Sequence, residues 1–365
     1  MCKLESPLTW DPVQWNTGTG SRGEDPARAR TSNGSPQHAH MTARDRLIVV
    51  AGEALVDLVL EREGTTTRHL GGGAYNAART IGRLGLAPVF LGRISSDVNG
   101  RALRAGLAQS DVRLDAVVDT DDPTTFALVD LDHDGAASYR FYADGTSISG
   151  LLPEQARAAM PPDAAALHVG GLGLVFEPQA RAIAGLVREA PSTTLVILDP
   201  NCRPGAAPYP AVHRERLREL MARVDVVKAS EEDLAYLEPD QPPLRTARDL
   251  LEQGPAVVLL TQGSRGATVI SPTGHVAVPA PPASVVDTIG AGDAFGGGWL
   301  AAWIAGGLDR AEMGDFDALV RTTRFAAQVA ARTCEHAGAE PPYALRLDDE
   351  WCMAAAVDRS SRTAH

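Results

Sequence analysis

The residues with the clearest chemical use lie in one short stretch of the chain, Asp287-Thr288-Ile289-Gly290-Ala291-Gly292-Asp293. The small residues Gly290, Ala291 and Gly292 let backbone N–H groups approach an anion, and a helix that begins there adds the positive end of its dipole. Asp293 follows at once and could take a proton from a hydroxyl group. Together these groups suit phosphoryl transfer, whereas the alternative is a tight turn whose aspartate only caps the helix.

The context of this stretch favours the chemical interpretation. Two valines precede it, as at the end of a strand, and an apolar helix is expected to follow it over residues 292–305. That helix contains three consecutive glycines at 296–298, and each costs a helix about 1 kcal/mol relative to alanine. We therefore expect another element or a ligand to approach the helix closely there. The sequence has no G-x-x-x-x-G-K-[ST] motif, so a P-loop kinase is not expected.

The composition limits the class of protein. The chain has 365 residues, of which 44% are apolar and 5% aromatic, so it can bury a large core built mainly from Ala, Val and Leu. The formal net charge of -12 argues against nucleic acid and anionic membranes as partners. The sequence contains no run of about 18 apolar residues and no secretion-signal core in its first 40 residues, so we expect a soluble, cytoplasmic protein.

The cysteines predict reduced thiols. Cys2, Cys202, Cys334 and Cys352 lie far apart and form no C-x-x-C pair. Neither a disulfide framework nor a structural zinc site is therefore expected.

One α/β domain is expected over residues 46–345, between a leader and a tail. Residues 1–45 are rich in Gly, Ser, Thr, Pro, Arg and Asp and lack apolar periodicity, which predicts a disordered leader. Met41 stands just before an apolar run, so we hypothesise that the preceding residues are an appended segment or a mis-called start. Residues 346–365 are assigned to a C-terminal tail.

Strand-like apolar runs alternate with helix-like windows along this domain. The expected strands lie at about 47–51, 88–92, 165–170, 194–198, 224–228 and 256–261. The expected helices lie near 74–84, 98–108, 177–189, 211–222, 243–252, 292–305 and 317–333. Apolar strands spaced by amphipathic helices indicate βαβ units, and hence a doubly wound, mostly parallel sheet with helices on both faces.

Two β-rich stretches break this alternation, at residues 54–70 and about 112–143. The second contains strand-like runs at 124–130 and 137–142, which an Asp-His-Asp-Gly turn joins into a predicted hairpin. A small sheet that projects from an α/β body could serve as a lid over a cleft or as a surface for a homodimer.

Two separated motifs resemble the signatures of the ribokinase-like, or PfkB, carbohydrate kinase family. The first is Gly71-Gly72-Gly73-Ala74-Tyr75-Asn76-Ala77-Ala78, followed by Ile81-Gly82-Arg83-Leu84-Gly85. The second is the Asp287 stretch, continued by Ala294-Phe295. The motifs stand in the family's order, about 215 residues apart, and the resemblance covers about residues 46–345.

The resemblance implies a catalytic site around Asp293. This carboxylate would deprotonate a sugar hydroxyl that attacks the γ-phosphate of ATP, and Gly290, Ala291 and Gly292 would supply the anion hole. Asp57 matches the position of a substrate-binding carboxylate, which can accept from two sugar hydroxyls. The alternative for Asp57 is a solvated aspartate at a strand end.

The same resemblance places further residues beside the sugar. Gly71, Gly72 and Asn76 carry over as substrate-binding residues. The alternative for the two glycines is a helix-start turn, and the alternative for Asn76 is a polar residue in the first helical turn. Arg203, in Asp199-Pro200-Asn201-Cys202-Arg203, could meet phosphate or substrate, and its alternative is an internal ion pair with Asp199. Asp97 with Gly100 resembles another family segment, although helix capping explains this pair equally well.

Nucleotide and metal sites are implied more weakly. Lys228, Ser230 and Asp233 fall where many relatives carry an N-x-x-E motif that organises Mg²⁺-bound water and phosphate, and here the carboxylate is the shorter aspartate. The loop that borders the nucleotide is matched by Thr261, Gly263 and Gly266, with a strand-connecting turn as the alternative. Asp287 and the Ile289 carbonyl resemble a monovalent-cation site, which would make K⁺ an activator beside ATP and Mg²⁺.

These motifs predict an ATP-dependent sugar kinase. The segments Gly52-Glu53-Ala54-Leu55-Val56-Asp57 and Asp199–Arg203 favour a fructokinase-like ketohexose substrate, while ribose and nucleosides stay open. An inactive sugar- or nucleotide-binding regulator is the alternative of another class, and the intact Asp293 speaks against it. A dinucleotide-dependent oxidoreductase is disfavoured, because the glycines after the strand at 165–170 do not have the G-x-G-x-x-G spacing.

Overall fold

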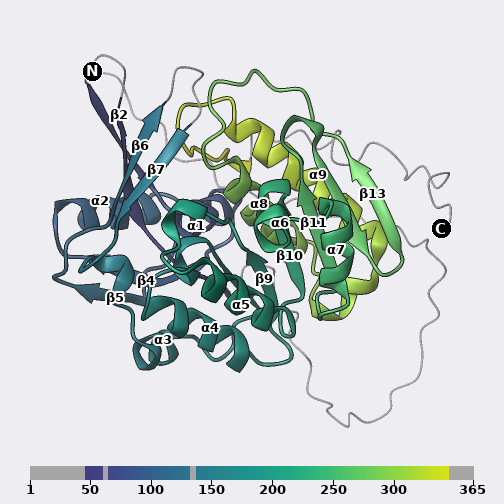
Figure 1. Ribbon diagram of the computed structural model, residues 1–365, viewed down its shortest axis with the longest axis horizontal. Coiled ribbons are helices and arrows are strands. Elements are labelled where there is room, and N and C mark those ends of the chain that lie inside the picture. The colour runs from purple at the N-terminus through teal and green to yellow at the C-terminus, as the bar shows by residue number, and fades with distance from the viewer. Residues whose placement is uncertain (1–45, 61–64, 132–136, 345–365) are drawn as a thin grey trace, which may run out of the picture. The chain divides into compact units, whose positions relative to one another are not determined.

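The structure, a computed structural model, describes residues 46–60, 65–131 and 137–344 (Figure 1). The predicted leader, the predicted Asp-His-Asp-Gly turn and the predicted tail lie outside these ranges. None of the described helices combines the length and the apolar character that a membrane span requires.

Nine of the described strands form one sheet, in the order β13-β12-β11-β10-β9-β8-β1-β4-β5. Their bounds are β1 Ile48–Ala51, β4 Val89–Ser95, β5 Val117–Thr120, β8 Ala166–Gly170, β9 Leu195–Asp199, β10 Val226–Ser230, β11 Val257–Thr261, β12 Ala267–Ser271 and β13 Gly274–Val278. Seven of them, β1, β4, β5 and β8 to β11, run parallel; β12 is antiparallel to both of its neighbours. The order reverses at β1, because the chain goes to β4 on one side and returns to β8 on the other. In open parallel sheets a ligand crevice forms at the carboxyl ends of the strands at such a reversal.

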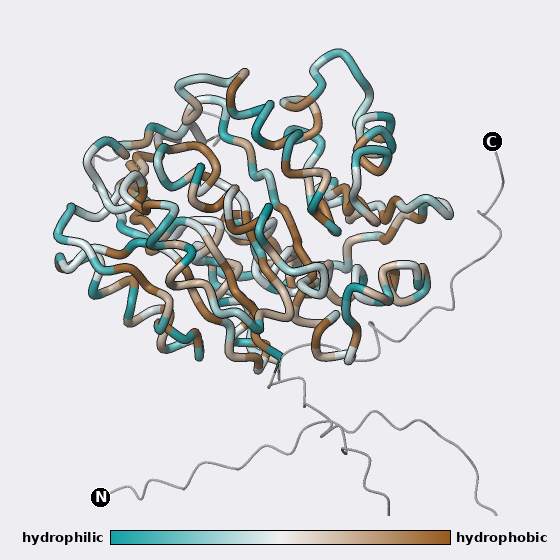
Figure 2. The backbone as a smooth tube through the Cα atoms, turned by 90° about the horizontal axis from the view of Figure 1, so that it is seen from below, coloured by the Kyte–Doolittle hydropathy of each residue, from teal (hydrophilic) through white to brown (hydrophobic). Residues whose placement is uncertain are grey.

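Helices cover both faces of this sheet, and alternate side chains of each strand face the two layers. Ile48 and Val50 of β1 join one core cluster, while Val49 and Ala51 join the other. The first layer holds α1 Gly73–Arg83, α2 Val98–Ala108, α8 Ala291–Ala305 and α9 Phe316–Thr333. The second holds α3 Pro153–Ala159, α4 Gln179–Glu189, α5 Pro210–Met221, α6 Glu231–Leu237 and α7 Pro243–Leu251. Figure 2 shows hydrophobic residues along the inner strands and hydrophilic residues at the outer loops.

Short 3₁₀ helices occupy several of the connections. Their bounds are η2 Ser147–Ser149, η3 Gly171–Leu174, η4 Pro204–Ala206, η5 Gly263–Arg265 and η6 Arg310–Gly314. The predicted fold class is confirmed, and the seven predicted helices agree with the observed ones to within two residues at each end. The pattern missed α3, α6 and the β12–β13 hairpin, because elements of five to seven residues carry too little periodicity.

A second sheet of four strands, in the order β3-β2-β6-β7, is called the lid here. Its strands are β2 Leu55–Leu60, β3 Thr66–Gly71, β6 Phe126–Leu131 and β7 Ala137–Tyr142. Figure 1 shows β2, β6 and β7 standing together. The β6–β7 pair confirms the predicted hairpin. The predicted lid segment 112–143 began too early, because β5 pairs in parallel with β4 and so belongs to the large sheet. Leu55, Ala127 and Leu172 are among the buried residues that join the lid to the large sheet's connections.

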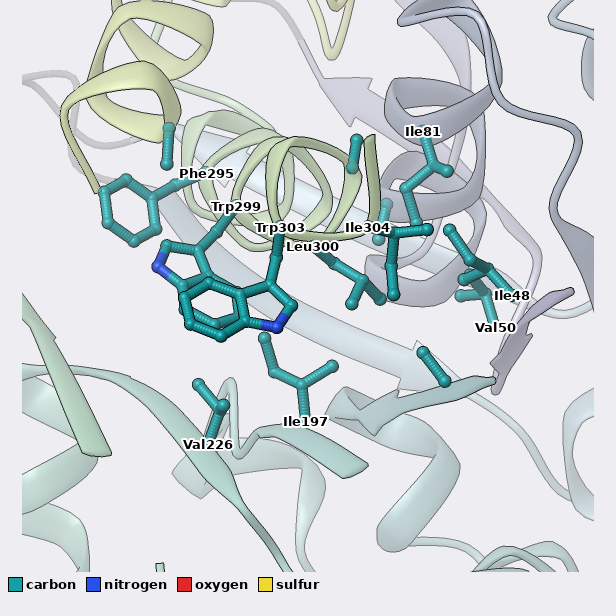
Figure 3. Close-up of a cluster of buried hydrophobic side chains, with 14 of the residues drawn as sticks. Ile48, Val50, Ile81, Ile197, Val226, Phe295, Trp299, Leu300, Trp303 and Ile304 are labelled. Carbon is teal, nitrogen blue, oxygen red and sulfur yellow. The ribbon is translucent and has the colours of Figure 1, made fainter. Parts of the chain in front are cut away.

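Helix α8 is the central helix of its layer. Its Trp299 and Trp303 rings stack with centroids 5.1 Å apart, and Figure 3 shows them above Ile197 and Val226 of the sheet. The predicted close approach at the glycines is also present. A methyl group built on Gly297 would lie 2.8 Å from the Ala77 carbonyl oxygen of α1, which places the two helix backbones in contact.

This contact gives a stability prediction. Gly297→Ala puts its methyl group against Ala77 and Thr80, and overpacking of this kind costs about 1–3 kcal/mol, more than the roughly 1 kcal/mol that alanine gains in a helix. We expect the free energy of unfolding, measured by urea titration, to fall. Gly185→Ala in α4 is the matched control, because open space surrounds that position, and it should raise stability by about 0.5–1 kcal/mol. Equal stabilisation by both substitutions would contradict the described packing.

Candidate active site

A cavity of about 920 Å³ lies between the lid and the carboxyl ends of the parallel strands. Residues that follow β1, β8 and β9 form its floor, the lid forms one wall, and the loop that enters α8 forms another. Its lining includes Glu53, Asp57, His69, Gly72, Gly73, Asn76, Tyr139, Phe141, Asn201, Arg203, Asp287, Ile289, Gly290, Gly292, Asp293 and Gly338. The cavity therefore occupies the strand-order reversal at β1, where the topology leads us to expect a ligand.

Asp293 lies in the first turn of α8 and is held by two amide groups. Nδ2 of Asn76 donates to Oδ2 of Asp293 at 2.9 Å, and Nδ2 of Asn201 donates to Oδ1 at 3.0 Å. Asn76 comes from α1 and Asn201 from the segment after β9, so two distant parts of the chain fix the carboxylate. Each carboxylate oxygen keeps a lone pair with which it can accept a further proton.

Two backbone conformations build this arrangement. Gly290, the residue before α8, has φ +75°, and a methyl group there would lie 2.4 Å from the Ala339 side chain. Asn201 has φ +41°, a left-handed conformation that costs a non-glycine residue energy and is concentrated at functional sites. The α8 N-terminus has no side-chain cap, so the N–H groups of its first turn are suited to an anion, although that of Ala291 also donates to the Thr288 carbonyl oxygen at 3.3 Å.

The electrostatics of the cavity come from buried carboxylates. Burial raises the pKa of Asp293, against the opposing effects of the Asn76 hydrogen bond and of Lys228 and Arg203. Burial and the nearby charge of Asp293 raise the pKa of Asp57 to about 7, and Arg203 opposes this rise. The site thus holds two carboxylates whose protonation responds to one arginine.

The lid presents a polar strip beside an aromatic one. Asp57 and His69 are direct cross-strand partners on β2 and β3, and both line the cavity. On β7, the Tyr139 and Phe141 rings lie parallel with centroids 6.0 Å apart, and the Arg203 guanidinium stands 5.7 Å from the Tyr139 centroid. Hydroxyl-binding groups next to an aromatic wall suit a polyol with one apolar face.

Asp199 forms its ion pair with Lys228, not with Arg203. Its Nζ lies 3.0 Å from Oδ2 of Asp199, and both side chains are about 95% buried. Burial opposes the charge on Lys228, but Asp199, Asp233 and Asp293 together raise its pKa. Among the described residues Asp199 pairs with Lys228 and not with Arg203, so the structure does not contain the alternative Asp199–Arg203 ion pair.

The chain matches one protein family over most of its length. Residues 45–344 match the family described as pfkB family carbohydrate kinase. The chain belongs to this family. A fructokinase of Rhizobium leguminosarum bv. trifolii is 34% identical over 263 residues, which cover 70% of this chain and 79% of the relative. A fructokinase of Klebsiella pneumoniae is 35% identical over 268 residues, covering 72% and 85%.

Solved structures agree with this assignment. A fructokinase from Xylella fastidiosa with bound ATP superposes with a TM-score of 0.73 at 29% identity, over 80% of this chain and 93% of that one. A fructokinase from Vibrio cholerae O395 with fructose, ADP and calcium gives a TM-score of 0.70 at 25% identity, over 81% and 95%. The protein is a sugar kinase with the family's α/β fold.

The structure brings most of the predicted catalytic and sugar-side residues together. Asp293, Gly290, Gly292, Asp57, Gly72, Asn76 and Arg203 all line the cavity. Ala291 and Gly71 adjoin lining residues in the chain, and a methyl group on Gly71 would lie 2.3 Å from Oδ2 of Asp57. Asp97 caps α2 by accepting from the Gly100 N–H at 2.7 Å and does not line the cavity, so the capping alternative describes that pair.

The predicted nucleotide residues lie beyond this cavity. Ser230 and Thr261 are neighbours across β10 and β11 at the same sheet edge, and Gly263 and Gly266 flank the turn after β11. Ser230 and Asp233 cap α6 reciprocally, and Oδ1 of Asp233 accepts from the Cys202 N–H at 2.6 Å. Both carboxylate oxygens of Asp233 thus accept hydrogen bonds from the chain, and the role of these residues stays a prediction.

The predicted monovalent-cation residues do line the cavity. Oδ1 of Asp287 accepts from the Ile289 N–H at 3.0 Å, and Oδ2 accepts from the Gly338 N–H at 2.8 Å. In the described residues, no group of three His, Cys, Asp or Glu side chains could hold a metal alone.

Sequence reasoning missed several residues of the cavity, among them Asn201, Glu53 and His69. Asn201 was overlooked as a partner of Asp293, although it stands in the segment that was singled out for Arg203. Glu53 is 2% exposed and accepts from two backbone N–H groups, and burial raises its pKa to about 7. His69 showed no motif, but its place opposite Asp57 in a strand pairing could have been inferred once β2 and β3 were aligned.

The two hydrogen bonds from asparagine amides to Asp293 predict the effect of removing Asn201. Asn201→Gly keeps the left-handed backbone but deletes the donor to Oδ1, so the carboxylate can rotate out of its productive orientation. Because misplacement of about 1 Å can cost on the order of 10²-fold in rate, we expect kcat to fall tenfold or more. Steady-state assays with saturating substrates measure this. The control is Asp111→Gly, a surface position that also has positive φ, and an equal loss there would contradict the assigned role.

Proposed function

We propose that this protein is an ATP-dependent fructokinase that uses Asp293 as its general base. The observation that carries the proposal is the buried Asp293 carboxylate, held by two amides at the uncapped start of α8 inside the cavity. The fructokinase relatives support fructose as the substrate, and the wall of hydroxyl-binding and aromatic residues fits a ketohexose. Asn76 adds to this, because its buried Oδ1 has no partner among the described residues and can accept from a sugar hydroxyl.

The proposed reaction follows from these groups. A sugar hydroxyl donates its hydrogen bond to Asp293, which takes the proton as the hydroxyl oxygen forms a bond to the γ-phosphorus of ATP. The bond from that phosphorus to the bridging oxygen breaks, and ADP leaves with the electron pair. The backbone N–H groups of Gly290, Ala291 and Gly292 stabilise the charge on the transferred group, aided by the α8 dipole.

Metal ions complete the proposal. Mg²⁺ neutralises phosphate charge when it is bound with ATP, and the protein would contact it mainly through water near Asp233. K⁺ would bind beside Asp287 and the Ile289 carbonyl. The nucleotide would be bordered by Lys228, Ser230, Thr261, Gly263 and Gly266. Of these, Lys228 lies close to the start of α8, because a methyl group built on Gly292 would lie 3.0 Å from its Nζ. A homodimer through the lid, whose Tyr142 is 56% exposed, also stays a prediction.

Substrate and base are tested together. A coupled ADP-release assay with Mg-ATP compares fructose, ribose, adenosine, inosine and 2-keto-3-deoxygluconate, and we expect the largest kcat/KM for fructose. Asp293→Asn should lower kcat by about 10²–10⁴-fold, the usual contribution of a general base. Asp249→Asn, on α7 and paired with Arg245, is the matched control and should retain activity. No stimulation by any sugar, or an Asp293→Asn variant as fast as the parent, would refute the proposal.

The raised carboxyl pKa values predict the pH dependence. Asp57 has a pKa of about 7, so its ionised form is lost as the pH falls through 7, and kcat/KM for fructose should fall with it. Arg203 lowers the pKa of both Asp57 and Asp293. In Arg203→Gln both pKa values should rise, so the fall of kcat/KM on the acid side should begin at higher pH. Initial rates between pH 5.5 and 9 measure the shift. If kcat/KM falls at the same pH in the variant as in the parent, neither carboxylate controls this pH dependence.

A further inference from the structure

Glu53 occupies the hinge at which the chain passes from the large sheet into the lid. It stands between the end of β1 and the start of β2, and the returning strand β3 leads through Gly72 into α1. Its side chain is buried and ties two segments together. Oε1 accepts from the Gly73 N–H at 2.7 Å, and Oε2 accepts from the Gly173 N–H of η3 at 2.9 Å.

The same residue caps the helix that carries Asn76. Helix α1 has no side-chain cap of its own at Gly72. Instead, Glu53 supplies two acceptors in trans, its Oε1 for the Gly73 N–H and its backbone carbonyl for the Tyr75 N–H at 3.2 Å. Since Asn76 is the next residue of the helix, the position of its amide depends on this cap.

The hinge also lies close to the base. A methyl group built on Gly73 would lie 3.2 Å from Oε1 of Glu53, 3.0 Å from Nδ2 of Asn201 and 3.4 Å from Oδ1 of Asp293. Gly72 has φ +110°, and a methyl group there would lie 2.7 Å from the Glu53 carbonyl oxygen. The two chain segments that pass between the large sheet and the lid thus pack against each other beside the asparagine hydrogen bonds to Asp293.

We propose that Glu53 is a positioning residue, which couples the hinge of the lid to the orientation of Asp293. Both carboxylate oxygens are needed, one for α1 and one for η3, while Asn76 and Asn201 transmit the resulting geometry to the base. The inference rests on the proposed function, because it assumes that Asp293 is the base. It adds a residue that does not itself touch the reacting atoms and acts through the backbone of the hinge.

Glu53→Gln is the most direct test, because glutamine keeps the size but has one acceptor oxygen and one NH₂ group. One of the two N–H groups then faces a donor, and we expect kcat to fall on the order of 10²-fold, with both KM values changed less than about threefold. The matched control is Asp225→Asn. Asp225 is buried, accepts from the Val196 N–H at 2.8 Å and pairs with two arginines. It directly precedes β10, so it lies at the amino ends of the parallel strands, away from the cavity at their carboxyl ends. It should lower the melting temperature and leave kcat unchanged.

A double-mutant cycle separates positioning from general damage. If Glu53 acts through Asp293, then Glu53→Gln in an Asp293→Asn background should cost less than about threefold in kcat. A full, additive loss in that background would overturn the inference, as would a loss in Glu53→Gln no larger than in Asp225→Asn.

Gly73→Ala tests the same coupling if Glu53→Gln fails to fold. Gly73 is the first residue of α1 and is not among the glycines with positive φ, so alanine suits its backbone, while the methyl group enters the junction of Glu53, Asn201 and Asp293. We expect a folded variant with a reduced kcat, and a variant with parental kcat would overturn the inference. Failure of the proposed function looks different, because the parent protein would then phosphorylate no sugar at all.

Discussion

The site depends on one constraint, the fixation of a buried carboxylate by two amides from distant parts of the chain. A carboxylate on an exposed loop would rotate freely and would be solvated. It would then be aligned with a substrate hydroxyl only part of the time, and it would be a weaker general base. Here Asn76 and Asn201 each occupy one oxygen of Asp293, and burial in the cavity raises its pKa towards that of a working base. The surrounding cavity is useful because this one group has a defined direction.

The fold meets the constraint through its topology and its glycines. Reversal of the strand order at β1 gathers the ends of β1, β8 and β9 at one edge, which brings Glu53 and Asn201 to the same place. Glycines then permit close approach: Gly73 leaves room for the side chains of Glu53, Asn201 and Asp293, and Gly297 lets the backbones of α8 and α1 meet. The stacked Trp299 and Trp303 hold the far part of α8 on the sheet, so the start of the helix is anchored.

Much of this could be predicted from the sequence, for reasons that lie in local pattern. Apolar periodicity placed the long helices, and the glycine motif placed Asp293 at the start of α8 beside small residues. What could not be predicted depends on contacts between segments far apart in the chain. Asn201 reaches a residue 92 positions away, and nothing in a single sequence records that distance. Lys228 pairs with Asp199 because β9 and β10 are neighbours, which only the strand order reveals. The position of β5 in the large sheet was missed for the same reason.

A crystal structure with fructose and a non-hydrolysable ATP analogue would show whether Asp293 faces the hydroxyl that is phosphorylated. We expect one fructose hydroxyl oxygen within about 2.6–3.2 Å of a carboxylate oxygen of Asp293, on the line towards the terminal phosphorus. Both asparagine contacts should persist in that complex. A sugar bound elsewhere, with Asp293 still gripped by its amides and facing no hydroxyl, would contradict it.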